Sequence, residues 1–154
     1  MADLTIQWSV ENERQLSRRL QNVRVETSDF SAAFKRSTEQ IRDRAAGPVF
    51  ETQGAVIGEP WPPLSAFTVA DKAAKGYGGQ PPLVRTGTMQ GSFRANHDKL
   101  GGVVWNDASY FKYHQSRRPR TRLPRRVMMK LDEFNRQVVV KSLQDHLRKA
   151  MRRR

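Results

Sequence analysis

The first residues of the chain alternate between apolar and polar side chains. Residues 4–10 read LTIQWSV, and this two-residue period is typical of a strand with one buried face. The period then lengthens, because Leu16, Leu20 and Val23 are spaced by four and three residues and share one side of a helix. The start of the chain therefore predicts a strand followed by a helix, with Asn12 as the N-cap.

A second helix is predicted after the polar cluster Thr27–Asp29. These side chains bond to free backbone N–H groups, so the cluster interrupts the first helix and caps the next. The stripe along one side of this helix consists of Phe30, Phe34, Ser37 and Ile41. Gly47-Pro48 should end or kink the helix, and Val49 and Phe50 can continue it for one more turn.

Residues 53–82 are rich in glycine and proline and predict a long loop. A connection of this length within a compact domain is usually functional or bound to a partner. One short helix is expected inside it, from Ser65 to Lys75, with Ser65 as its cap.

The second half of the chain predicts short strands and a final helix. Aromatic and β-branched residues favour strands at 92–96, 101–106 and 110–115, which with the first strand could form an antiparallel sheet. The prolines at 119 and 124 favour an extended loop, and residues 128–131 are predicted to return as a strand. Asp132 should cap the final helix, although the run Val138–Val140 leaves a strand open there. The expected buried face of that helix comprises Phe134, Val138, Leu143, Leu147 and Met151.

The length of 154 residues fits a single domain, 1–154. The chain contains no cysteine, which excludes disulfides and thiolate metal sites. The first residues lack a basic segment followed by an apolar one, and no run approaches the ~20 apolar residues that span a membrane. We therefore expect no membrane insertion and a cytosolic site of synthesis.

The net charge of +13 is concentrated in the last third of the chain. Residues 1–111 carry 13 Lys and Arg against 12 Asp and Glu, whereas residues 112–154 carry 15 against 3. Most of these cations are arginines, the better phosphate-binding group. This field favours a polyanion, namely DNA, RNA or an acidic protein surface.

A basic loop at 116–126 and an Arg-rich tail at 148–154 contain many of these cations. The candidates for contact with DNA or an acidic partner are Lys112, Arg117, Arg118, Arg120, Arg122, Arg125 and Arg126. Two interpretations stay open: sequence-independent phosphate contacts, or an assembly loop that docks on acidic neighbouring subunits.

No catalytic or metal-binding constellation is found. His97, His114 and His146 have no metal-ligand spacing, and adjacent His97 and Asp98 would point to opposite faces of a strand. The glycines at 76, 78 and 79 lack the Gly-Lys-Ser or Gly-Lys-Thr of a phosphate loop. We therefore predict no enzyme, no cofactor and no metal. Trp61 is interpreted as a hydrophobic plug over the sheet, or alternatively as an anchor for a neighbouring subunit.

An ordered set of motifs then runs from residue 50 to about residue 131. It comprises Phe50-x-x-x-Gly54, Trp61-x-Pro63-Leu64-Ser65-x-x-Thr68-x-x-x-Lys72, Leu83-x-x-Thr86-Gly87-x-Met89-x-x-Ser92, Tyr113-His114-Gln115 and Pro124-Arg125-Arg126. In this order the motifs resemble the phage virion-morphogenesis family, also described as tail-completion or neck proteins. The family usually has glycine soon after the His-Gln pair, where this chain has Ser116-Arg117-Arg118.

The resemblance implies an α+β fold, with N-terminal helices packed on a small antiparallel β-sheet, a long central loop and a C-terminal helix. It also implies a structural component of a tailed-phage virion, found in the virion neck or tail and in the host cytoplasm during assembly. The implied assembly residues are Trp61, Pro63, Leu64, Ser65, Thr68, Lys72, Thr86, Gly87, Ser92, His114 and Gln115.

The expected partners also follow from the resemblance. They are further copies of the chain, as a hexameric or dodecameric ring, other neck, connector or tail proteins, and phage DNA in the lumen. The ring would lie at the head-tail junction or, as a tail terminator, at the upper end of the tail, and would serve tail completion or head-tail joining. The alternative is a nonspecific nucleic-acid-binding or DNA-packaging-associated protein.

Overall fold

The computed structural model describes residues 13–152 except 119 and 122, so the strand predicted at residues 4–10 lies outside the described residues. The helices are α1 (Glu13–Glu26), α2 (Ser31–Ala46), α3 (Pro48–Glu51), the 3-10 helix η1 (Ala55–Ile57), α4 (Ala66–Ala74), α5 (Thr88–Gly91), α6 (Phe111–Gln115) and α7 (Glu133–Arg152). Two strands, β1 (Phe93–His97) and β2 (Gly102–Asn106), form an antiparallel hairpin. The predicted α+β class is confirmed.

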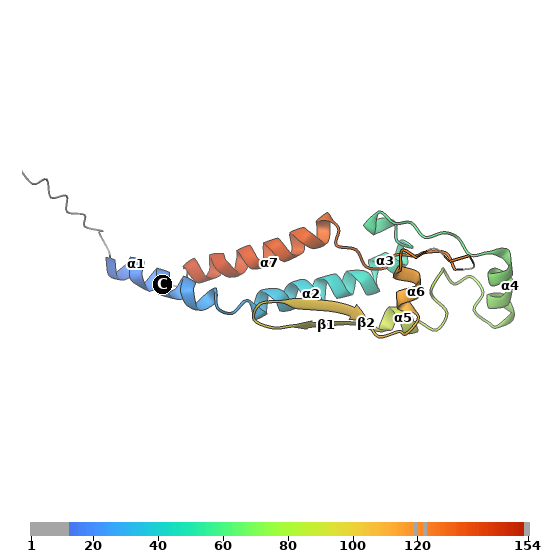
Figure 1. The fold of residues 1–154 in the computed structure, drawn as a ribbon, viewed down its shortest axis with the longest axis horizontal. Helices are drawn as coiled ribbons and strands as arrows, with labels where there is room; N and C mark the ends of the chain where they lie inside the picture. The colour runs from blue at the N-terminus through green and yellow to red at the C-terminus, as the bar shows by residue number, and fades with distance from the viewer. Residues whose placement is uncertain (1–12, 119, 122, 153–154) are drawn as a thin grey trace, which may run out of the picture.

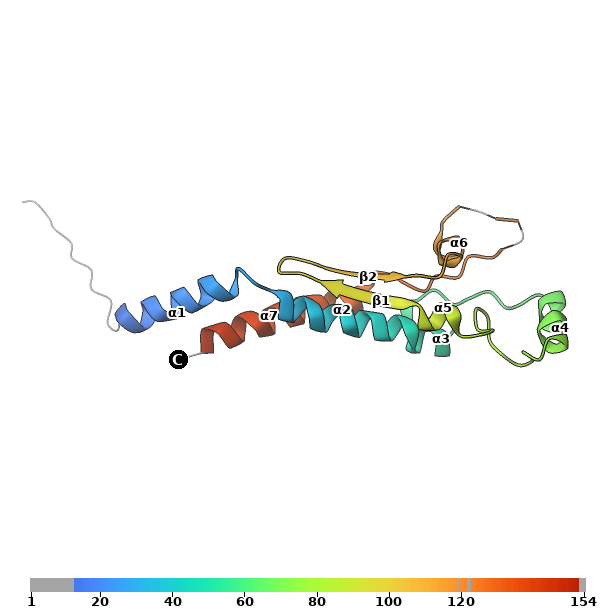
Figure 2. The same cartoon turned by 90° about the horizontal axis from the view of Figure 1, so that it is seen from below.

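The molecule is elongated and has two regions (Figures 1 and 2). The stem consists of α1, α2, α7 and the β1–β2 hairpin, and α2 contacts both α7 and the two strands. The loop end consists of residues 58–92 and 107–127, and α4 lies at its tip (Figure 1). α1 packs on α7 at the opposite end of the molecule. α2 is therefore the helix that packs on the two strands.

Local chemistry sets the ends of α2. Asp29 Oδ1 accepts a hydrogen bond from the Ser31 N–H at 2.9 Å, although the N-cap of α2 is Phe30, whose side chain makes no capping bond. Gly47-Pro48 ends the helix, and α3 continues the chain for one turn. Ser37 and Thr38 are buried because both hydroxyls donate to Phe34 O, at 3.1 and 2.8 Å.

The hairpin lies close against α2. Its register pairs Phe93 with Asn106 and His97 with Gly102. A Cβ added to Gly102 would lie 2.4 Å from Thr38 Cγ2, so glycine permits this approach. Val103 and Trp105 point away from α2 and are exposed.

α7 begins at the predicted cap but buries a different face. Asp132 Oδ1 accepts from the Asn135 N–H at 3.0 Å. Val138 is buried as predicted, whereas Phe134 and Met151 are about half exposed. The other buried residues of this helix are Asn135, Ser142, His146 and Ala150. The predicted face was therefore wrong in register, because polar side chains, among them the hydrogen-bonded Asn135, share the buried stripe.

Two predicted strands are wrong. Residues 110–115 contain α6, and residues 128–131 have no regular secondary structure and pair with no strand in the described part of the chain. Gln115 takes the place of a strand partner: its Oε1 accepts from the N–H groups of Met128 and Met129, at 3.0 and 3.3 Å. Its Nε2 donates to Met129 O. A single side-chain amide thus satisfies backbone groups that a sheet would otherwise satisfy.

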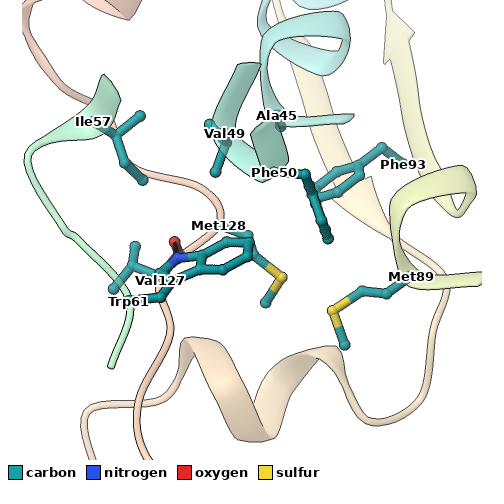
Figure 3. Close-up of a cluster of buried hydrophobic side chains, with 9 residues drawn as sticks. All are labelled: Ala45, Val49, Phe50, Ile57, Trp61, Met89, Phe93, Val127 and Met128. Carbon is teal, nitrogen blue, oxygen red and sulfur yellow. Dashed lines mark hydrogen bonds between the residues drawn. The ribbon is translucent and has the colours of Figure 1, made fainter. Parts of the chain in front are cut away.

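The hydrophobic core lies where the stem meets the loop end (Figure 3). Its buried cluster contains Ala45, Val49, Phe50, Ile57, Trp61, Met89, Phe93, Val127 and Met128. Trp61, Phe50, Phe93 and Phe111 form a chain of edge-to-face ring contacts, with centroids 5.3, 6.3 and 5.8 Å apart. Such contacts add to the stabilisation from burial alone. The core therefore anchors the loop end onto α2 and the hairpin.

Candidate functional site

The predicted assembly residues converge on the loop end. Eight of the eleven line one pocket of about 660 Å³, which we call the motif pocket. These eight are Pro63, Leu64, Ser65, Thr68, Lys72, Thr86, Gly87 and His114. Of the other three, Trp61 lies in the core, Ser92 ends α5, and Gln115 holds the segment at 128–129. Residues far apart in the sequence thus meet at one site.

Trp61 fixes the start of the loop. Its side chain is 6% exposed, and its Nε1 donates to Val127 O at 2.7 Å. Gly54 has φ +83° and lies under the indole: a Cβ there would lie 2.2 Å from Glu59 O and 2.5 Å from Trp61 Nε1. This close approach and the positive φ explain the glycine of the Phe50-x-x-x-Gly54 motif. Trp61 is a buried plug within the monomer, packed edge-on against Phe50.

Arg126 holds the proline pair that follows Trp61. Its Nε and Nη2 donate to Pro62 O at 3.1 and 2.9 Å, and Nη2 also donates to Pro63 O at 3.1 Å. The residue is 5% exposed, and burial lowers the pKa of its guanidinium. The prediction of Arg126 as a DNA or acidic-partner contact is therefore corrected, because its donors serve the chain's own carbonyls.

Lys72 performs a similar task from the last turn of α4. Its Nζ donates to Gln80 O, Pro81 O and Val84 O at 2.9, 3.0 and 2.7 Å, which uses all three donors of the ammonium. The residue is 7% exposed, and burial, followed by the nearby charge of Arg85, lowers its pKa. Lys72 therefore determines the path of residues 80–84 around the pocket.

Hydroxyl groups shape the two short helices beside the pocket. Ser65 caps α4 as predicted, since its Oγ accepts from the Thr68 N–H at 3.2 Å. Gly87 has φ +73° and starts α5, and the hydroxyls of Thr86 and Thr88 lie 2.7 Å apart beside it. Ser92 Oγ donates to Thr88 O at 2.6 Å at the other end of α5. These groups satisfy helix ends that would otherwise need water.

His114 closes the pocket from α6. Its Nδ1 is buried and has no hydrogen-bond partner among the described residues. Burial lowers the pKa of the imidazole, the charge of Arg126 lowers it further, and a hydrogen bond to the Pro124 backbone partly opposes both effects. The neutral ring therefore presents Nδ1 as an acceptor that the described residues leave open.

The remaining predicted cations differ in availability. Arg117 and Arg118 are exposed, while Arg120 Cζ and Lys112 Nζ lie 4.4 and 5.2 Å from the centre of the Tyr113 ring. Arg125 lies near Glu59, with Nη1 3.7 Å from Oε2. Arg122 lies outside the described residues. Tyr113 of α6 thus contacts one cation of its own helix, Lys112, and one of the basic loop, Arg120.

Arg44 is a structural residue that the sequence did not reveal. Its Nη1 donates to Asp132 Oδ1 and Asn135 Oδ1 at 2.9 and 3.0 Å, and its Nη2 donates to Val56 O at 2.9 Å. Burial would raise the pKa of Asp132, but the hydrogen bonds from Arg44 and Asn135 outweigh it and lower the pKa. Arg44 thereby joins α2, η1 and α7, and no local sequence signal marks it.

The polar groups of the loop end hold the loops of their own chain in place. Lys72 and Arg126 donate to backbone carbonyls of their own chain. In the part of the chain that the structure describes, no group of three or more His, Asp or Glu residues could hold a metal ion. No described helix combines the length and apolar character needed to cross a membrane. Fold and site together define an α+β protein whose central loops are pinned by single side chains.

Comparison with known protein families identifies the family of this chain. The chain belongs to the phage virion morphogenesis family, whose model matches residues 11–148. The family suggested by the motifs is therefore confirmed, and the match extends beyond them into α1 and α7. No curated protein and no solved structure gave a significant match.

Proposed function

We propose that the chain is a structural, non-catalytic component of the tailed-phage virion that forms a ring. The ring lies at the head-tail junction or at the upper end of the tail, and it completes the tail or joins it to the head. The observation that carries this proposal is the family match over residues 11–148. The partners are other copies, as a hexamer or dodecamer, together with adjacent neck, connector or tail proteins.

The distribution of exposed apolar side chains supports self-association. Leu16, Leu20 and Val25 are exposed on α1, and Phe67 and Val69 are exposed on α4 at the other end of the molecule. Phe67 is 82% exposed, which is unusual for a phenylalanine. A ring is built from heterologous contacts between two different patches of each subunit. An elongated subunit with exposed apolar side chains at both ends is compatible with this requirement.

Two measurements on the full chain test the proposal. Native mass spectrometry should give a single closed oligomer, and quantitative mass spectrometry of purified virions should give a fixed copy number matching that oligomer. Particle imaging would then place the ring at the neck or at the top of the tail. A chain that stayed monomeric at all concentrations and was missing from virions would overturn the proposal.

Nonspecific nucleic-acid binding is a second candidate, supported by the charge distribution. Residues 112–154 hold 15 of the 28 cations, and Arg117, Arg118 and Arg120 are exposed on the basic loop. Phosphate contacts by these residues would need no recognition helix. In a ring that surrounds the DNA passage, both functions would be compatible.

A salt titration with duplex DNA tests this second candidate function. If Arg117, Arg118 and Arg120 each contact a phosphate, changing all three to glutamine should reduce the slope of log Kobs against log salt by about 2.7. The matched control changes Arg14, Arg18 and Arg19 to glutamine, which removes the same charge from the exposed surface of α1. Equal slopes for both variants would attribute the effect to net charge alone and reject a DNA-contacting loop.

A further inference from the structure

A second cleft, of about 420 Å³, lies between β2 and α7, and α2 contributes to its lining. We call it the β2 cleft. Its walls are mainly apolar: Val104 comes from β2, Val139 from α7 and Ile41 from α2. Met129 and Leu131 line it from the segment that precedes α7. This cleft lies in the stem and shares none of the lining residues of the motif pocket.

One wall of the β2 cleft is a free strand edge. Asp98 N donates to Gly101 O at 2.8 Å, and Asp107 N donates to Ser92 O at 3.0 Å. Hydrogen-bonded and non-bonded pairs alternate along an antiparallel ladder, so Val103 and Trp105 direct their backbone groups to β1. Those of Gly102 and Val104 therefore point the other way. Within the described residues no strand pairs with this edge.

Residues 4–10, which we call the N-terminal arm, have the sequence pattern that such an edge can bind. Leu4, Ile6, Trp8 and Val10 would share one face of a strand, with Thr5, Gln7 and Ser9 on the other. Seven extended residues span about 23 Å, enough to follow the five residues of β2. Strand addition would satisfy the backbone of the edge while the apolar face of the arm filled the cleft.

We propose that the N-terminal arm of one copy adds as a strand to the free edge of β2 in a second copy. The arm's own cleft is a poor destination, because α1 carries Glu13 at its outer end, away from the hairpin (Figures 1 and 2). Fourteen helical residues extend about 21 Å. Residues 4–12 would use most of their reach of about 30 Å merely to run back along α1. A neighbouring subunit brings its cleft to the arm without this detour.

The exchange deepens the proposed ring and rests on self-association of the chain. Each copy would donate one arm and accept one, which links subunits head to tail. The apolar residues of the arm would then be buried in the assembly, and the acceptor edge would be covered.

Photo-crosslinking tests the exchange directly. The full chain is prepared with the substitution Trp8→benzoylphenylalanine, and copies labelled with ¹⁵N are assembled with unlabelled copies. The expected products are crosslinks between an unlabelled arm and a ¹⁵N-labelled peptide that contains Val104 or Val139. Crosslinks between a labelled arm and the corresponding unlabelled peptide are expected as well. The matched control is Gln7→benzoylphenylalanine, one residue away on the polar face, and its yield of these products should be several-fold lower. Links only within one isotope, or links to other surfaces, would overturn the exchange.

A backbone variant provides a second measurement. Val104→Pro removes an N–H that points to the free edge, whereas Val103→Pro removes one that pairs with β1. Val104→Pro should therefore lose the mixed-isotope links and assembled mass while the hairpin amides stay protected from hydrogen exchange. Val103→Pro should lose that hairpin protection. If the unmodified chain forms virion rings without arm links, the exchange alone fails. If it neither self-associates nor enters virions, the proposed function fails as well.

Discussion

The stem and the loop end are stabilised in different ways. In the stem, α2 and α7 pack along their length, so each buried side chain contributes a small part of the total. In the loop end, single side chains serve several backbone groups at once. Lys72 donates to three carbonyls and Arg126 to two, while Gln115 serves two N–H groups and one carbonyl. Apart from Arg44, which joins α2 to η1 and α7, stability is thus distributed in the stem and concentrated in the loop end.

This difference explains why ordered motifs cover the loop end and leave the stem almost unmarked. A loop without regular structure must satisfy its backbone N–H and C=O groups by other means. A side chain that bonds to several of them is hard to replace, because its loss leaves all of them unpaired. A helix satisfies its own backbone, so its sequence needs only suitable propensity and a buried stripe. The motif residues therefore maintain the shape of the motif pocket.

The largest expected effect of a single substitution is at Trp61. Trp61→Ala should lower the free energy of unfolding by about 3–5 kcal/mol, because it empties the centre of the core and leaves Val127 O unpaired. The matched change Trp105→Ala should cost clearly less, because Trp105 is 38% exposed on the outer face of the hairpin and lies outside the buried cluster. Urea denaturation measures both. Similar losses for the two variants would contradict a loop end anchored through Trp61.

Lys72 should show the next largest effect. Lys72→Met keeps the aliphatic stem but removes the donor to Gln80, Pro81 and Val84, and should cost about 2–3 kcal/mol. The control Lys75→Met changes the same residue type one turn further on, where the ammonium is exposed and pairs with Asp71. It should cost under about 0.5 kcal/mol. Hydrogen exchange should show new opening of residues 80–86 in Lys72→Met, and equal stability of the two variants would reject the carbonyl-clamp role.

The same comparison shows how far the sequence predicted the structure. The helices of the stem, the hairpin and the Ser65 and Asp132 caps depend on local patterns, and these predictions were confirmed. The strand predicted at 110–115 is the short helix α6, and the strand predicted at 128–131 failed because the Gln115 amide, distant in sequence from Met128, satisfies that backbone instead. A local pattern contains no information about such a contact.

The sequence also left open which arginines are exposed and which are buried. Arg126 was grouped with the exposed arginines because the residue type usually contacts solvent or a polyanion. Its actual role depends on two proline carbonyls more than sixty positions earlier. The order of the motifs predicted which residues belong together but not that eight of them would line one pocket. The burial of Asn135, Ser142 and His146 likewise required knowledge of what packs against α7.

His114 should give a pH dependence to the loop end. Its folded-state pKa lies below the ordinary value of 6.5, because burial and the nearby Arg126 disfavour the imidazolium. The unfolded chain therefore binds more protons below pH 6.5, and the stability that His114 contributes above this value is lost as pH falls through the folded pKa. The wild-type chain should lose more stability between about pH 7 and pH 5 than His114→Gln does.

Asp132 provides a contrast at the base of the stem. Its pKa is lowered from 3.8, so its contribution is present above that value and is lost only at more acidic pH. Asp132→Asn should therefore alter the acid limb of the stability curve and leave the neutral region unchanged in slope. Denaturant titrations across both ranges check the two windows, and an identical curve for His114→Gln and the wild type would reject a buried neutral imidazole.

The smallest effect is expected at Leu20 on α1. Leu20 is 61% exposed, and glutamine has a helix propensity close to that of leucine, so Leu20→Gln should change monomer stability by under about 0.5 kcal/mol. Val138→Gln, at a buried position of α7, should cost several times more because it forces an amide into the packed stripe. If Leu20→Gln instead reduces the assembled fraction while the monomer stays equally stable, the stem surface acts in association. The stem would then provide at least one of the contacts between subunits.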